Sequence, residues 1–180
     1  EKDFGALGHG SGQVKEPMAV ESLAEGAVCV ADSYNHRLQI FSKEPGAAPR
    51  VIGGDGPGEN GEGDGPGQFS LPVGVACDGT SLYVADTFNH RVQKLRLADG
   101  AHLGTVGKAD CTDGDGEREF KCPVGMCVAA GLLYVCDTYN HRIVVLGTDL
   151  TWRYTFGRYG RRKGEFNEPV AVAAHGGELY

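Results

Sequence analysis

The chain has 180 residues, of which 41% are hydrophobic and 23% are charged, and its formal net charge is −7. This length is enough for one domain with a sizeable core. The sequence contains no run of 18 apolar residues, so no membrane-spanning helix is predicted. The negative net charge disfavours extensive binding to nucleic acid.

The chain opens with the predicted end of a structural unit. Residues 3–5 (Asp-Phe-Gly) precede a Gly-rich loop that leads to Glu16 and Pro17, and the same arrangement returns at residues 155–157, ahead of Glu168 and Pro169. We therefore expect residues 1–16 to supply the last strand of a unit whose earlier strands are absent.

One ten-residue stretch then occurs three times, at 32–41 (DSYNHRLQIF), 86–95 (DTFNHRVQKL) and 137–146 (DTYNHRIVVL). The copies are spaced by 54 and 51 residues, and a period in this range is typical of stacked supersecondary units. Strand-forming runs precede and follow each copy. The repeat therefore predicts a turn between two strands in every unit.

The polar residues of the repeated turn are its candidate structural residues. The Asp is expected to accept hydrogen bonds from amides two residues on, the Asn to adopt positive φ, and the His to form hydrogen bonds within the turn. The Arg is expected to pair with the Asp or with a neighbouring unit. The set comprises Asp32, Asn35, His36, Arg37, Asp86, Asn89, His90, Arg91, Asp137, Asn140, His141 and Arg142.

These stretches, each preceded by a short apolar strand and followed by an aliphatic one, resemble the NHL repeat. The resemblance implies an all-β fold, a β-propeller of four-stranded antiparallel blades, here incomplete, with about three full blades and two partial ones. The expected divisions of this single propeller segment, 1–180, are 1–16 for the end of a preceding blade, 17–68 for blade one and an acidic Gly-rich loop, 69–119 for blade two, 120–165 for blade three and 166–180 for the start of blade four.

Two acidic loops are candidate calcium sites. Residues 53–68 match no calcium-binding spacing and are predicted to be a solvated connector. Asp113, Asp115 and Glu117 alternate like the opening of a calcium loop, but Arg118 stands where that loop needs glycine. We predict no metal here.

One basic cluster stands out in the acidic chain, on the loop 157–164. It could bind a phosphate backbone or an acidic peptide, with its aromatic residue as a stacking surface; otherwise it is a solvated run of charge. Its members are Arg158, Tyr159, Arg161, Arg162 and Lys163.

No catalytic centre is predicted. The histidines of the repeat, one per blade, should lie around a ring and too far apart to share an ion, and no nucleophile motif or phosphate-binding loop occurs. A zinc-dependent peptide-amidating lyase has a related propeller and stays an alternative, although none of its zinc ligands can be assigned here. We expect no enzyme activity and no cofactor.

The resemblance implies an interaction scaffold that binds a protein partner through its loops and faces. Single-stranded RNA binding, as in NHL propellers of tripartite-motif ubiquitin ligases, is the alternative. Because both ends of the predicted ring are open, self-association is also considered. The six cysteines are predicted to be free thiols, although Cys111 and Cys122 are the one pair that could form a disulfide. Free thiols favour a reducing, cytoplasmic location.

Overall fold

The computed structural model describes residues 6–44, 46–108 and 110–180, so the expected strand at residues 3–5 lies outside the described part. Within that part the chain is all-β, with three four-stranded antiparallel sheets and two small two-stranded ones. The predicted fold class is confirmed. No helix of the described residues has the length and apolarity needed to cross a membrane.

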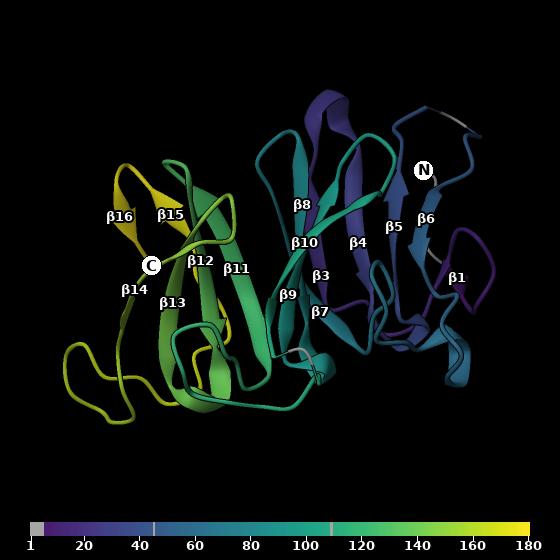
Figure 1. The fold of residues 1–180 in the computed structure, drawn as a ribbon. Helices are drawn as coiled ribbons and strands as arrows, with labels where there is room; N and C mark the ends of the chain where they lie inside the picture. Colours follow the sequence, from purple (N-terminus) through teal and green to yellow (C-terminus); the bar gives the residue numbers. More distant parts are fainter. Residues whose placement is uncertain (1–5, 45, 109) are drawn as a thin grey trace.

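Each four-stranded sheet is an up-and-down meander of neighbouring strands, and each is called a blade below (Figure 1). Blade one contains β3 (Ala19–Ser22), β4 (Val28–Asp32), β5 (Arg37–Phe41) and β6 (Arg50–Gly53). Blade two contains β7 (Pro72–Cys77), β8 (Ser81–Asp86), β9 (Arg91–Arg96) and β10 (His102–Gly107). Blade three contains β11 (Pro123–Ala129), β12 (Leu132–Asp137), β13 (Arg142–Gly147) and β14 (Trp152–Phe156).

The remaining elements are short. The strands β1 (Ala6–Leu7) and β2 (Gln13–Val14) have two residues each and pair in parallel. The strands β15 (Ala174–His175) and β16 (Glu178–Leu179) also have two residues each and pair antiparallel. Single 3₁₀ turns are η1 (Ala24–Gly26), η2 (Ser33–Asn35), η3 (Glu59–Gly61), η4 (Thr87–Asn89) and η5 (Thr138–Asn140). The turns η2, η4 and η5 are the repeated stretches.

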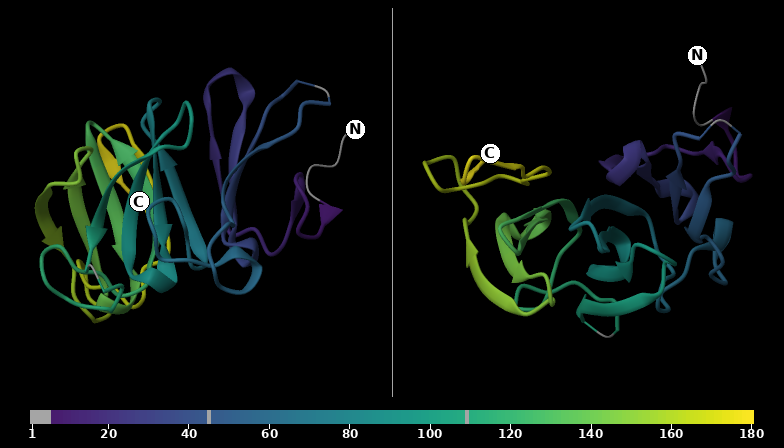
Figure 2. Two further views of the ribbon diagram at one scale, coloured as in Figure 1. Left: turned by 45° about the vertical axis from the view of Figure 1, so that its right-hand side comes forward. Right: turned by 90° about the horizontal axis from the view of Figure 1, so that it is seen from above.

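The blades stand side by side along an arc that stays open between the β15–β16 hairpin and the N-terminal strands (Figure 2). The first strand of blade two, β7, contacts the first strands of both other blades, β3 and β11, on the inner side of the arc. A Cβ on Gly74 would lie only 1.9 Å from the carbonyl oxygen of Val124, and one on Gly125 only 2.5 Å from that of Val170. Glycine at these positions therefore lets the inner strands approach backbone to backbone.

The hydrophobic core lies between blades rather than within one. Side chains of β8 alternate between the two faces of the sheet. Leu82 and Val84 belong to a cluster shared with blade one, whereas Tyr83 and Ala85 belong to a cluster shared with blade three. Blade two is thus stabilised by the blades on both sides of it.

Candidate functional site

The polar residues of the repeated turn form one buried network in each blade. In blade two the carboxylate of Asp86 accepts hydrogen bonds from Arg91 Nε at 2.7 Å, Asn89 Nδ2 at 2.9 Å, Gln93 Nε2 at 3.1 Å and the Ser70 amide at 2.7 Å. Asp86 is fully buried, and a buried carboxylate needs such partners. Blades one and three repeat the Arg–Asp pair at 2.7 Å.

Two details of the predicted turn are wrong. The amides that the carboxylates bind belong to the preceding loop, at Lys15, Ser70 and Lys121, and not to the turn itself. The positive φ falls on the histidines, at 50 to 55°, and not on the asparagines. The reason is that the Asp side chain points into the junction between strand and loop, where the Asn and Arg side chains converge on it.

Each arginine of the network also holds a Gly-rich loop. In blade two, Arg91 donates through Nη1 to the carbonyl of Asp64 at 2.5 Å and through Nη2 to those of Gly65 and Gln68 at 3.0 and 3.1 Å. Asn89 donates to the carbonyl of Gly63 at 2.9 Å. We call this arrangement the arginine clamp and the loop it grips, residues 63–68, a glycine loop. Residues 63–68 of the predicted connector are therefore fixed rather than merely solvated.

The same clamp occurs in the other two blades. Arg37 grips the glycine loop 8–13 in blade one, and Arg142 grips the glycine loop 114–119 in blade three. Asn35 and Asn140 donate to the first glycine of each loop, at 2.9 and 2.7 Å. The network is thus a repeated structural joint.

The histidines connect each blade to the next. Nδ1 accepts the amide of Leu71 at His36, of Cys122 at His90 and of Glu168 at His141, at 3.0 to 3.1 Å. Nδ1 is therefore the unprotonated nitrogen. The prediction that these rings form hydrogen bonds within the turn is wrong, because they bond to the following unit. Among the described residues no group of three or more His, Cys, Asp and Glu is placed to hold a metal ion.

Burial governs the ionisation of the carboxylates in the network. It raises the pKa of Asp86 and of Asp137, while the nearby guanidinium groups of Arg91 and Arg142 act in the opposite direction. Both carboxylates are fully buried. They can hold neighbouring groups in place but cannot reach a molecule in solvent.

The aromatic residue of each turn has the opposite environment. Tyr34, Phe88 and Tyr139 are 42%, 59% and 51% exposed, although the residue before each of them is buried. Their backbone amides are fixed by carbonyls of the preceding loop at 3.1 to 3.2 Å. Lys15 Nζ lies 6.0 Å from the centre of the Tyr34 ring. The turns lie along the lower edge in Figure 1, and we call this edge the turn rim.

These rings were not among the predicted site residues. The signal was present in the sequence, because an aromatic side chain recurs at one position of an otherwise polar turn. The structure shows that this position is exposed in all three blades.

The basic loop is exposed, as its charge pattern indicates. Arg158 pairs with Glu165 at 3.0 Å, and the 66% exposed ring of Tyr159 lies edge-on to His141, with centroids 4.9 Å apart. The side chains of Arg161, Arg162 and Lys163 are exposed and make no ion pair within the described part of the chain. The loop therefore offers three cations to solvent.

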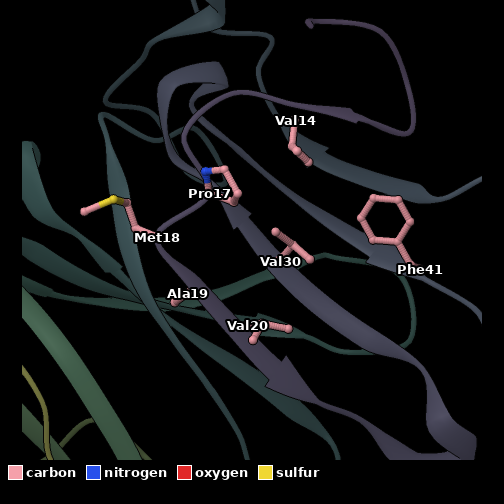
Figure 3. Close-up of a pocket in the computed structure, with 7 residues that line it drawn as sticks. All are labelled: Val14, Pro17, Met18, Ala19, Val20, Val30 and Phe41. Atoms are coloured by element: carbon pink, nitrogen blue, oxygen red, sulfur yellow. The ribbon is translucent and has the colours of Figure 1, made fainter. Parts of the chain in front are cut away.

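An apolar hollow of about 320 Å³ lies on the face of blade one that points away from blade two (Figure 3). Val14, Met18, Val20 and Phe41 line it. Val20 is 65% exposed, whereas Val75, its counterpart in blade two, is 6% exposed because blade one covers it. The hollow is the counterpart of an interface between blades.

Four-stranded meanders that share their cores and line an arc with their first strands define a β-propeller. The model of the NHL repeat matches residues 21–41 and 120–146. The chain belongs to the NHL-repeat family, as the repeated turns indicated.

Two curated relatives carry the same family name. NHL repeat-containing protein 2 of Gallus gallus is 33% identical over 132 residues, covering 65% of this chain and 18% of its own. The protein of that name from Bos taurus is 32% identical over 149 residues, covering 73% and 20%. The chain spans about a fifth of the length of these relatives.

Solved structures show the same fold at low identity. The WD40 repeats of RRP9 align with a TM-score of 0.59 and 18% identity, over 87% of this chain and 40% of that one. Streptogramin B lyase aligns with a TM-score of 0.60 and 12% identity, over 87% and 44%. Because these identities are low, the likeness concerns the fold alone.

Proposed function

We propose that this propeller segment is a non-catalytic interaction module that binds a protein partner through its turn rim. The observation that carries the proposal is the row of exposed rings, Tyr34, Phe88 and Tyr139, one on each blade. Aromatic side chains are enriched at protein interfaces because they bury a large area at little cost in conformational entropy. Their anchored backbones give this surface a fixed geometry.

The buried part of the turn supports a binding role over a catalytic one. Its acids, amides and guanidinium groups are engaged with one another and with loop carbonyls, and its histidines accept backbone amides. What the turn presents to solvent is an aromatic surface. A surface of that kind suits recognition of a partner.

The test compares two triple variants in affinity capture from cell extract. One replaces Tyr34, Phe88 and Tyr139 with alanine. The matched control replaces Val51, Leu103 and Tyr154, which are 39% to 45% exposed on outer strands. We expect the rim variant to lose its captured proteins and the control to keep them. Equal capture by both variants would contradict the proposal.

RNA binding is the second candidate, and the exposed cations of the basic loop support it. Binding of random single-stranded RNA should fall steeply as salt rises if phosphates are contacted. Replacing Arg161, Arg162 and Lys163 with glutamine should abolish that dependence. An absence of binding at low salt would exclude this candidate.

A zinc-dependent lyase is the remaining alternative. Metal analysis of the purified chain tests it, because such an enzyme needs about one zinc ion per chain. We also propose a reducing compartment, since all six cysteines are free thiols in the structure. Imaging of the tagged protein in cells would check the location.

A further inference from the structure

The linker between blades one and two holds an imidazole of one blade and an exposed ring of the next. The Leu71 amide donates to His36 Nδ1 at 3.0 Å. The Phe88 amide donates to the carbonyl of Ser70, the residue before Leu71, at 3.1 Å. We call these four residues, His36, Ser70, Leu71 and Phe88, the first seam. The backbone around both rings is thus attached to one short stretch of chain on the turn rim.

The junction between blades two and three repeats this arrangement. The Cys122 amide donates to His90 Nδ1 at 3.1 Å, and the Tyr139 amide donates to the carbonyl of Lys121 at 3.1 Å. Leu71 and Cys122 also share a left-handed backbone, with φ of 48° and 50°. We call His90, Lys121, Cys122 and Tyr139 the second seam. Each seam lies between two complete four-stranded blades.

Each seam combines an exposed aromatic face with an N–H donor. Because Nδ1 of His36 and of His90 accepts a backbone amide, the proton of the neutral ring is on Nε2. No described residue accepts a hydrogen bond from Nε2 of either ring, and both rings are only partly buried. The rings of Phe88 and Tyr139 are 59% and 51% exposed. A ligand that fits the seams therefore needs apolar surface and hydrogen-bond acceptors.

The charges at the seams disfavour phosphates as those acceptors. At the first seam, the Ser70 hydroxyl donates to the carboxylate of Glu62. At the second seam, Lys121 Nζ pairs with Asp113 at 2.9 Å, and the two side chains are 45% and 48% exposed. Each seam thus has a carboxylate beside it, and the cation of the second seam is already paired. Binding of a phosphate backbone depends on cations that neutralise it, so the seams suit an uncharged ligand.

A proline-rich polypeptide has the complementary chemistry. Proline has no backbone N–H, so its main chain presents only carbonyl acceptors. In the polyproline II conformation these carbonyls make no internal hydrogen bonds and face solvent. Proline-rich segments dock on surfaces lined by aromatic side chains, and their preformed conformation keeps the entropic cost of binding low. Such a segment is also uncharged, so Glu62 and Asp113 do not repel it.

We propose that the two seams bind a proline-rich segment of the partner protein in the polyproline II conformation. Phe88 and Tyr139 pack against prolines, and Nε2 of His36 and of His90 donates to carbonyls of the segment. Because the seams recur from blade to blade, a segment that follows the turn rim contacts them in turn. This inference rests on the proposed function, since it names the class of partner that the rim binds.

The probe is a fluorescein-labelled peptide of about ten prolines, which forms about three turns of polyproline II helix. It is titrated with the chain and followed by fluorescence anisotropy, beside a flexible glycine–serine peptide of equal length. We expect saturable binding of the proline peptide and at least about tenfold weaker binding of the glycine–serine peptide. Equal affinity for the two peptides, or no saturable binding of the proline peptide, would overturn the proposal. Tighter binding of a labelled oligouridine would identify a nucleic-acid surface and would overturn it too.

A first pair of variants tests the aromatic face. Phe88→Ala should weaken binding of the proline peptide about tenfold. The matched control is Tyr154→Ala, which removes a ring that is 45% exposed on the outer strand β14 and should change the affinity less than about twofold. Equal affinities of the two variants would contradict the proposal.

A second pair tests the donor separately from the joint between blades. In His90→Asn, the side-chain oxygen can still accept the Cys122 amide, but no atom remains at the position of Nε2. We expect about fivefold weaker binding of the peptide and an unchanged melting temperature. His102→Asn is the control, because His102 bonds to Thr105 within its own blade. Wild-type affinity of His90→Asn would contradict the proposal. If His90→Asn melts earlier, the Phe88→Ala comparison decides.

The capture experiment distinguishes a failure of this inference from a failure of the proposed function. If the rim variant loses its captured proteins but the proline peptide does not bind, the rim is a binding surface and the class of partner is wrong. If the rim variant keeps its captured proteins, the proposed function itself fails.

Discussion

The buried and the exposed halves of the repeated turn differ in what their repetition means. Asp86, Asn89 and Arg91 are at most 7% exposed, and each is used in joining the blade to a loop. Phe88, within the same turn, is 59% exposed and packs into no core cluster. Recurrence of the polar residues follows from the fold, whereas recurrence of the aromatic residue does not. The burial and the contacts of a repeated residue must therefore be known before a role can be assigned to it.

Removing the clamp is the strongest way to test the buried half. Arg91→Ala leaves the carboxylate of Asp86 and three loop carbonyls without their guanidinium partner. We expect the free energy of unfolding to fall by about 3 to 5 kcal/mol, as for other broken buried ion pairs. Urea denaturation measures the change. The control is Arg96→Ala, whose ion pair with Asp99 is half exposed and should contribute at most about 1 kcal/mol.

The histidine joint should have the next largest effect. His90→Ala leaves the Cys122 amide without its acceptor, and we expect a loss of about 1 to 2 kcal/mol. Amide hydrogen exchange at Cys122 should accelerate accordingly. His102 makes its hydrogen bond within its own blade, so His102→Ala serves as the control. Unchanged exchange at Cys122 would show that the joint does not hold the blades together.

A pH series tests the opposite edge of blade two, where Asp78 lies. Partial burial alone would raise the pKa of Asp78. Hydrogen bonds from Thr80, Tyr83 and Ser81 outweigh this effect and lower the pKa to about 2. Its stabilising effect is therefore present above its ordinary value of about 4 and is lost as pH falls towards 2. Asp78→Asn should be less stable than wild type at neutral pH, and the gap in melting temperature should narrow below about pH 4. A gap that is constant with pH would contradict this.

The exposed half should show the smallest change in stability. Phe88→Ala removes a ring that packs into no core cluster, so the free energy of unfolding should change by no more than about 0.5 kcal/mol. Calorimetry of the variant checks this value. A loss above about 2 kcal/mol would place the ring with the buried half and remove the basis for the turn rim as a binding surface.

The strands could be predicted because strand-forming runs flank each copy of the turn, and the blade architecture could be predicted because these stretches resemble the NHL repeat. The partners of the turn residues could not. His36 bonds to the amide of Leu71, and Arg91 grips the carbonyl of Asp64. Both contacts join segments of different blades or loops through backbone groups, which have no signature in side-chain sequence. Asp, Asn and His were therefore assigned to the turn, where only local partners can be considered.

The basic loop shows a related limit. Its charge is evident in the sequence, but the likeness of residues 160–165 to the three glycine loops lies in hydrogen bonds of the backbone and in the bond that the Arg162 amide donates to Glu165 Oε2. Aligning the four loops by glycine spacing would have revealed the equivalence.

The histidine and arginine joints point in opposite directions along the chain, the first to the unit that follows and the second to the loop that precedes. Every repeat of the sequence consequently carries one histidine joint and one arginine joint. A gene segment duplicated at any period would arrive with both connectors and join its new neighbours without further mutation. Growth of such a ring by tandem duplication is thereby built into the geometry of a single turn.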